Sequence, residues 1–201
     1  MKLVSLLEKL EYTCLQGSTD QEVKNVIYDS RKVEEGSLFI CIRGAVVDGH
    51  KFVPDVIAKG AKVLVVEEAV EAPEDVTVIL VKDTRYAMAF ISAAYFGHPA
   101  DKLKTIGITG TKGKTTTTYM VKSILENAGY KVGLIGTIEA IIGDKVIPAK
   151  NTTPESYMIQ EYFHEMVEAG CDCVVMEVSS QGLMLHRTQG FVFDFGIFTN
   201  I

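Results

Sequence analysis

The 201-residue sequence has no long apolar run and no excess of basic residues, and each absence excludes a class of protein. No stretch approaches the roughly 20 apolar residues that a membrane-spanning helix needs, and the N-terminus shows no cleavable signal pattern. The net charge is −6, so no overall basic field would offset the phosphate repulsion of a nucleic acid. We therefore expect a cytoplasmic protein that binds neither membranes nor nucleic acids.

Cysteine is also scarce, and the four cysteines form no Cys-x-x-Cys pair. Cys171 and Cys173 stand at the start of an apolar run, so we expect two small core side chains on one face of a strand rather than a metal site. His50 is expected in a turn, and none of the four histidines is placed to act as a general base.

Apolar runs that predict strands alternate with segments of helical spacing, and this alternation indicates an α/β fold. The length suits one large or two small domains. We expect a small N-terminal α/β domain at residues 1–82 and a P-loop ATPase-like, mostly parallel sheet domain at residues 83–201. The strands are expected within 26–31, 36–44, 62–67, 76–81, 105–109, 131–137, 173–180 and 193–201, and a hairpin at 141–147.

The most informative stretch joins a β-branched run at 105–109 to a helical pattern at 119–125. Gly110 and Gly113 lie between them, and a glycine-bearing turn before a helix lets backbone N–H groups surround a polyphosphate. The strict P-loop motif would also have glycine at position 108, where this chain has isoleucine. The pattern still predicts a nucleoside triphosphate site, with Lys114 at the β- and γ-phosphates.

Three polar segments should meet at the carboxyl ends of the parallel strands, where ligands bind in such sheets. They are 110–116, 151–153 and 177–180. The Glu177 carboxylate could complete a Mg²⁺ shell with the Thr115 hydroxyl. The structural alternatives are a glycine-rich turn with a solvated lysine, a helix cap at 151–153 and a solvated strand end at Glu177.

Several segments resemble the Mur ligase family. Residues 107–117 resemble its ATP loop, and residues 151–154 and 176–187 resemble specifically the tripeptide synthetases of the MurE type. Residues 28–31, 36–39 and 48–50 resemble the N-terminal UDP-binding domain of that type. The matches occur in the expected order, from about residue 26 to the last residue.

The resemblance implies an ATP-dependent ligase of peptidoglycan precursor synthesis. Such enzymes use ATP to phosphorylate the free carboxylate of UDP-N-acetylmuramoyl-L-alanyl-D-glutamate. The amine of a diamino acid, meso-diaminopimelate or L-lysine, then attacks the acyl phosphate to give an amide. The sequence leaves open which diamino acid is added.

The family's functional residues fall on three groups of positions. The residues expected at ATP are Gly110, Thr111, Lys112, Gly113, Lys114, Thr115 and Thr116, with Lys114, Thr115 and Glu177 catalytic and Thr115 and Glu177 at Mg²⁺. The residues expected at the UDP end are Tyr28, Ser30, Ala45, Val46 and Val47. The residues expected at the muramoyl-dipeptide are Asn151, Thr152, Thr153, Ser179 and Arg187.

The chain departs from the family pattern at a few positions. Lys112, Gln181 and Leu185 stand where asparagine, histidine and glutamine are usual, and Ala45 and Val46 replace polar side chains near the uracil. The family also continues into a further domain with a carbamylated lysine. We therefore expect this sequence to be the front part of a longer, monomeric enzyme and to be inactive alone.

Two other functions stay open at this point. A non-catalytic module that binds nucleotide and UDP-sugar would use the same residues. Another ligase of the superfamily, such as a folylpolyglutamate synthetase, would place the phosphate loop much nearer residue 50, and residues 1–82 argue against it.

Overall fold

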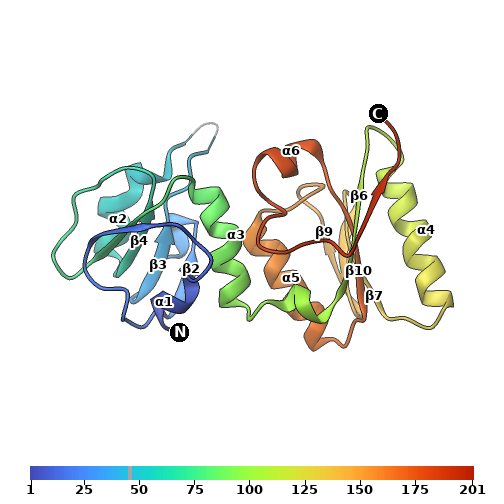
Figure 1. Ribbon diagram of the computed structural model, residues 1–201, viewed down its shortest axis with the longest axis horizontal. Helices are drawn as coiled ribbons and strands as arrows, with labels where there is room; N and C mark the ends of the chain where they lie inside the picture. Colours follow the sequence, from blue (N-terminus) through green and yellow to red (C-terminus); the bar gives the residue numbers. More distant parts are fainter. Residues whose placement is uncertain (45–46) are drawn as a thin grey trace. The chain divides into compact units, whose positions relative to one another are not determined.

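The computed structural model describes residues 1–44 and 47–201 (Figure 1). The chain divides into two compact units, Met1–Tyr95 and Phe96–Ile201. Each unit holds one sheet with its helices, which confirms the expected α/β class. The units divide after a helix at 84–95, whereas the sequence suggested a cut after residue 82. Among the helices of the described residues, none is both long and apolar enough to cross a membrane.

The sheet of the N-terminal unit has the strand order β1-β5-β4-β3-β2. Strands β2 to β5 are parallel, and β1 pairs antiparallel with β5. The strands are β1 (Thr13–Gln16), β2 (Asn25–Ile27), β3 (Ser37–Ile40), β4 (Val63–Val66) and β5 (Thr77–Leu80). The helices are α1 (Leu3–Leu6), α2 (Val53–Ala58) and α3 (Thr84–Tyr95), with short 3₁₀ turns η1 (Ser30–Lys32) and η2 (Gly49–Phe52).

The buried strands of this unit follow the apolar runs of the sequence. All four residues of β3 and of β4 are buried, as expected for parallel strands covered on both faces. β1 is an edge strand whose side chains are mostly exposed, so its sequence has no apolar pattern that would predict a strand. Asp83 begins α3 as expected, because its carboxylate accepts from the Tyr86 amide at 2.8 Å.

The sheet of the C-terminal unit has the order β11-β6-β10-β7-β8-β9. The first four strands are parallel, and β8 and β9 form the expected antiparallel hairpin. The strands are β6 (Lys104–Thr109), β7 (Val132–Ile135), β8 (Glu139–Ile142), β9 (Lys145–Pro148), β10 (Cys173–Glu177) and β11 (Phe195–Phe198). The helices are η3 (Pro99–Lys102), α4 (Lys114–Asn127), α5 (Ser156–Glu168) and α6 (Ser180–Met184).

Helices α4 and α5 cover opposite faces of this sheet (Figure 1). Side chains along β10 alternate between them: Cys173 and Val175 lie in the cluster under α4, and Val174 and Met176 in the cluster under α5. Cys171 precedes the strand and joins the α5 cluster. The two cysteines are buried as expected, but the expectation that they share one strand face was wrong.

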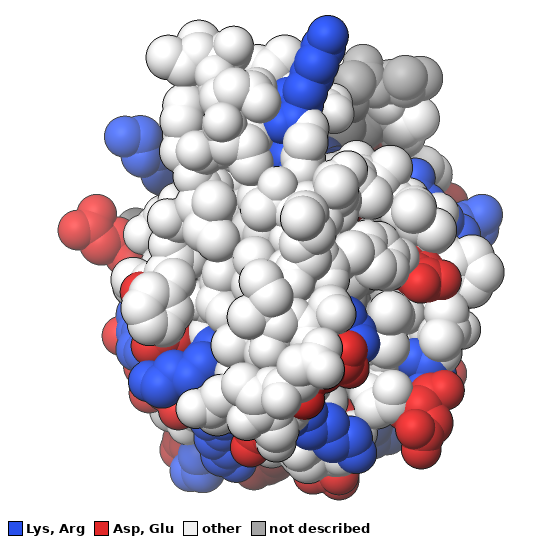
Figure 2. Space-filling view, turned by 90° about the vertical axis from the view of Figure 1, so that its right-hand side faces the viewer, with Lys and Arg blue, Asp and Glu red and all other residues white. Residues whose placement is uncertain are grey.

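β11 forms an edge of this sheet, because it pairs only with β6. Figure 2, which faces the α4 side, shows charged side chains mainly toward the rim and a largely uncharged centre. Exposed apolar side chains of the unit include Met120 and Ile124 on α4 and Phe195 and Phe198 on β11.

Candidate functional site

The phosphate loop joins β6 to α4. Gly110 has φ 137° and Gly113 has φ 82°, and residues that carry a side chain rarely adopt these backbone conformations. Gly113 is the N-cap residue, and α4 begins at Lys114. The first amides of a helix have no carbonyl one turn earlier, so the N–H groups of Lys114, Thr115 and Thr116 lack a partner within α4. This arrangement suits the oxygens of a phosphate group.

Lys114 lies across the same loop. Its Nζ donates to the Gly110 carbonyl oxygen at 2.7 Å. That partner carries no formal charge, and within the described residues no carboxylate forms an ion pair with Lys114. The ammonium charge therefore remains available for an anion at the start of α4.

The first half of the loop is held by the segment that follows β11. The Thr111 amide donates to the Asn200 carbonyl oxygen at 3.3 Å, and the Lys112 amide donates to Asn200 Oδ1 at 3.1 Å. These two amides are thus engaged with protein, although both residues were expected at ATP. The amides from Gly113 to Thr116 form the open part of the loop.

Glu177 ends β10, which lies directly beside β6, and its side chain is buried with 1% of the residue exposed. Its Oε2 accepts from the Thr115 hydroxyl at 3.0 Å and from the Thr137 hydroxyl at 3.1 Å, while Oε1 accepts from the Thr137 amide at 2.9 Å. A buried carboxylate is costly without such donors. Gly136 is needed here, because a Cβ at that position would lie 2.6 Å from Glu177 Oε1.

Thr115 and Glu177 fit a divalent cation. Hydroxyl and carboxylate oxygens are ligands that Mg²⁺ accepts beside nucleotide phosphates. The two side chains meet at 3.0 Å at the start of α4, as the sequence predicted for a metal pair. In the described part of the chain, Glu177 has hydroxyl and amide donors but no lysine or arginine partner, so its charge is open to a cation.

The loop 151–153 connects to the same carboxylate. Thr152 Oγ1 lies 3.0 Å from Thr137 Oγ1, and Thr137 in turn contacts Glu177. Thr153 is buried, donates to the Glu177 carbonyl oxygen at 3.0 Å and accepts from the Ser179 amide at 3.0 Å. The loop does not cap α5, whose N-cap residue is Glu155 and whose start has no side-chain capping hydrogen bond. Asn151 is exposed.

Arg187 and Ser179 complete this group. The Arg187 guanidinium donates to the Thr153 carbonyl oxygen at 3.0 Å and to Glu155 Oε1 at 2.7 Å. Ser179 caps α6, because its hydroxyl accepts from the Gly182 amide at 3.0 Å. The structure thus brings Thr152, Thr153, Ser179 and Arg187 together, with Arg187 already paired to a carboxylate.

A separate pocket of ≈ 410 Å³ lies in the N-terminal unit. Tyr28 and Ser30, both expected at the UDP end, line it with Phe39 and Phe52. Val47 is exposed and is not among the lining residues, while Ala45 and Val46 lie outside the described residues. At its rim the Arg31 guanidinium binds Asp29 at 2.9 and 2.7 Å and lowers the pKa of that carboxyl to about 2.

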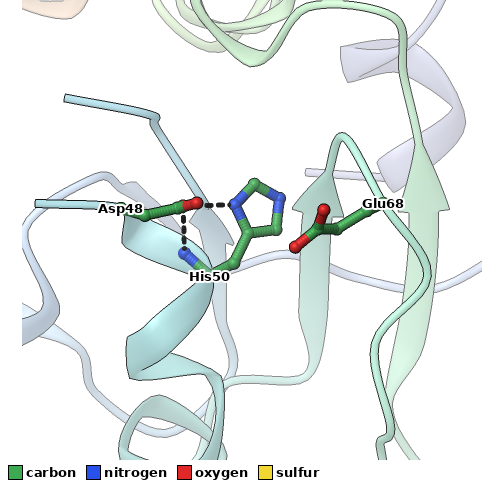
Figure 3. A group of neighbouring side chains, drawn as sticks. All are labelled: Asp48, His50 and Glu68. Carbon is green, nitrogen blue, oxygen red and sulfur yellow. Dashed lines mark hydrogen bonds and ion pairs between the residues drawn. The ribbon is translucent and has the colours of Figure 1, made fainter. Parts of the chain in front are cut away.

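Asp48, His50 and Glu68 form another polar cluster of this unit, with Asp48 and Glu68 on opposite sides of the His50 ring (Figure 3). Both ring nitrogens of His50 are used: Nδ1 lies 2.6 Å from Asp48 Oδ1, and Nε2 accepts from the Glu67 amide at 2.9 Å. Arg43 pairs with Asp48 at 3.4 Å and with Glu68 at 2.6 Å. A protein cation therefore already contacts both carboxylates, and His50 fixes the turn in which it was expected.

Sequence reasoning missed two residues of the C-terminal unit. Thr137 holds Glu177 through both its amide and its hydroxyl, and Asn200 holds the phosphate loop. The position of Thr137 at the end of a predicted strand was the one signal available for it. No signal in the sequence pointed to Asn200, because its partner Lys112 lies 88 residues earlier in the chain.

The sequence also matches known family descriptions. The description "Mur ligase family, catalytic domain" matches residues 22–96, and "Mur ligase middle domain" matches residues 108–201. The chain belongs to the Mur ligase family.

Its relatives include a named ligase. The UDP-N-acetylmuramoyl-L-alanyl-D-glutamate–2,6-diaminopimelate ligase of Clostridium perfringens is 54% identical over 201 residues, which is 100% of this chain and 42% of that protein. The chain thus spans well under half the length of this relative.

Solved structures share the fold. A UDP-N-acetylmuramoyl-L-alanyl-D-glutamate–2,6-diaminopimelate ligase superposes with a TM-score of 0.82 at 22% identity, over 100% of this chain and 40% of that one. The MurF ligase of Thermotoga maritima, solved in complex with ADP, has a TM-score of 0.58 at 21% identity, over 89% of this chain and 38% of that one. At these identities the likeness supports the fold alone.

Proposed function

We propose that this chain supplies the nucleotide-binding and UDP-sugar-binding parts of a MurE-type ligase. Such an enzyme joins a diamino acid to UDP-N-acetylmuramoyl-L-alanyl-D-glutamate with cleavage of ATP to ADP and phosphate. The observation that carries this proposal is the meeting of the α4 N-terminus, Lys114, Thr115 and Glu177 beside the loop 151–153.

The phosphate loop holds the tail of ATP in this proposal. The amides from Gly113 to Thr116 bind phosphate oxygens, and Lys114 neutralises charge on the transferred group. Thr115 and Glu177 hold Mg²⁺. When bound, Mg·ATP supplies the phosphoryl group that activates the substrate carboxylate. The protein contributes by positioning two anions, the phosphate and the carboxylate, that would otherwise repel each other.

The muramoyl-dipeptide is assigned to the residues gathered at the loop 151–153. Asn151 and Thr152 offer amide and hydroxyl groups from the loop, and Thr153 fixes Ser179 next to it. Arg187 meets a substrate carboxylate if its pair with Glu155 opens. The direct link from Thr152 through Thr137 to Glu177 supports placing this substrate beside the metal.

The UDP end is assigned to the pocket of the N-terminal unit. Tyr28, Phe39 and Phe52 offer apolar surface of the kind that suits a flat base, with Ser30 as a polar contact. Asp29 and Arg31 at its rim neutralise each other, so the pocket presents little net charge to the uracil. Ala45, Val46 and Val47 are assigned to the same end by the family resemblance alone.

The names of the relatives favour 2,6-diaminopimelate over lysine as the amino acid added. Because the chain spans about 42% of those relatives, we propose that it binds nucleotides without completing the amide. A non-catalytic binding module is the alternative, and it has the same binding properties.

Calorimetry tests the proposal on the 201-residue chain. We expect ADP to bind with Mg²⁺ and to lose affinity when Mg²⁺ is chelated, and we expect UDP-N-acetylmuramoyl-L-alanyl-D-glutamate to bind separately. Adding diaminopimelate and ATP should release no phosphate. No measurable ADP binding at millimolar concentration would overturn the nucleotide assignment, whereas turnover would overturn the claim of incompleteness.

A further inference from the structure

We propose that Asn200 is a positioning residue that sets the phosphate loop in its nucleotide-binding shape before the nucleotide arrives. This inference rests on the proposed ATP site at the same loop. It concerns how that loop is held rather than which groups touch the phosphates.

The contact is specific to the asparagine side chain. Asn200 Oδ1 accepts from the Lys112 amide at 3.1 Å, and Asn200 Nδ2 donates to the Lys112 carbonyl oxygen at 3.0 Å. One planar amide thus satisfies both backbone groups of one loop residue. Aspartate keeps the acceptor but has no donor for the carbonyl. The Asn200 carbonyl oxygen adds a third bond, from the Thr111 amide at 3.3 Å.

Thr199 extends the same contact to the base of the loop. Its hydroxyl lies 2.7 Å from the Lys112 carbonyl oxygen and 3.2 Å from the Thr109 carbonyl oxygen, and its amide donates to Thr109 at 2.9 Å. The approach is close enough to explain Gly110, where a Cβ would lie 2.2 Å from Thr199 Oγ1. Gly110 is therefore required by its neighbour as well as by its φ angle.

Strand pairing places residues 199 and 200 beside the loop. β11 runs parallel to β6, with Phe198 opposite Thr109, so residues 199 and 200 continue alongside the loop that follows β6. The Lys112 peptide is thereby fixed against the sheet edge, and the amides from Gly113 onward are left as the phosphate contacts. A loop already ordered loses less conformational freedom on binding, which favours affinity.

The experiment compares three variants of the 201-residue chain by calorimetry with ADP at saturating Mg²⁺. Asn200→Ala removes both side-chain bonds, and Asn200→Asp keeps the acceptor, removes the donor and adds a negative charge beside the loop. Asn127→Ala is the matched control, because this exposed asparagine at the far end of α4 bonds only within its own helix. We expect ADP affinity to fall roughly 5- to 10-fold in Asn200→Ala, to fall at least as far in Asn200→Asp because its carboxylate also repels phosphate, and to stay unchanged in Asn127→Ala.

Two further readouts separate positioning from general destabilisation. Hydrogen exchange at the Thr111 and Lys112 amides should be faster in Asn200→Ala without nucleotide, while exchange in β10 stays slow. UMP binding to the N-terminal unit should be unchanged. Equal ADP affinity in Asn200→Ala and the parent chain, or equal loss of UMP binding, would overturn the inference. If the parent chain binds no ADP, the proposed function fails, while the exchange measurement still decides whether Asn200 orders the loop.

Discussion

In the N-terminal unit, charged side chains near the strand ends pair with one another, whereas in the described part of the C-terminal unit Lys114 and Glu177 have no charged partner. Asp29 pairs with Arg31, and Arg43 pairs with both Asp48 and Glu68. Lys114 instead bonds to a carbonyl oxygen, and Glu177 to hydroxyl and amide groups. The difference indicates a pocket for a neutral group in one unit and a site for an anion with its cation in the other.

Of these substitutions, Lys114→Ala should have the largest effect, because it removes the cation that lies across the phosphate loop. Losing a charge-assisted bond to phosphate is worth about 1.5–3 kcal/mol, so ADP affinity should fall about 10- to 100-fold in calorimetry. Lys122→Ala, which removes a lysine paired with Glu126 on the same helix, is the control and should leave ADP affinity unchanged. An equal effect of the two variants would mean that only the overall charge matters.

Glu177→Gln should weaken the dependence of ADP binding on Mg²⁺. The neutral amide keeps the size of the side chain but loses the charge that attracts the cation, so we expect about a 10-fold loss of the Mg²⁺-dependent affinity. Titrating Mg²⁺ at fixed ADP measures it, with Glu126→Gln as the control on α4. An unchanged Mg²⁺ midpoint would exclude Glu177 as a metal ligand.

Thr137→Val should weaken Mg²⁺ binding by a smaller factor. The substitution keeps the amide bond to Glu177 but removes the hydroxyl bond, worth about 1 kcal/mol. We expect the Mg²⁺ midpoint to rise about 3- to 5-fold, and Thr117→Val, two residues after Thr115 and on another side of α4, to leave it in place. If Thr137→Val and the parent chain share one midpoint, the hydroxyl has no part in orienting the carboxylate.

Asp29→Asn tests the neutralised rim of the other pocket and should have the smallest effect. The pKa of Asp29 is about 2, below its ordinary value of 3.8, because Arg31 binds the carboxylate. The pair therefore stabilises the fold above about pH 4, and its contribution is lost as the pH falls from about 4 toward 2. Because Arg31 is 86% exposed, we expect Tm to fall by at most about 3 °C at pH 7. A difference that grows as the pH falls would contradict this account.

The sequence predicted much of the fold because the buried strands carry continuous apolar runs. β4, β7 and β10 lie within the expected ranges, and β6 begins one residue earlier than expected. β1 escaped prediction because an exposed edge strand needs no apolar pattern, and α1 covers only Leu3–Leu6 of a longer periodic stretch.

The candidate site could be predicted where its chemistry is local or where a predicted strand end places a residue at the site. The turn from Gly110 to Thr115 carries its own signature, and the pairing of Glu177 with Thr115 followed from the position of a strand end. Thr137 and Asn200 depend on contacts across 40 and 88 residues, which no local pattern encodes. The occupation of the Thr111 and Lys112 amides was missed for the same reason.

The strand order also determines when the site can form. β6 pairs with β10 and β11, and both strands come much later in the sequence than β6. The native parallel partners of the phosphate strand are therefore synthesised only when residues 173–177, which lie between β6 and β7, have been made. Such distant pairing slows folding. The carboxylate at the end of β10 thus joins the phosphate loop in the same event that closes the centre of the sheet.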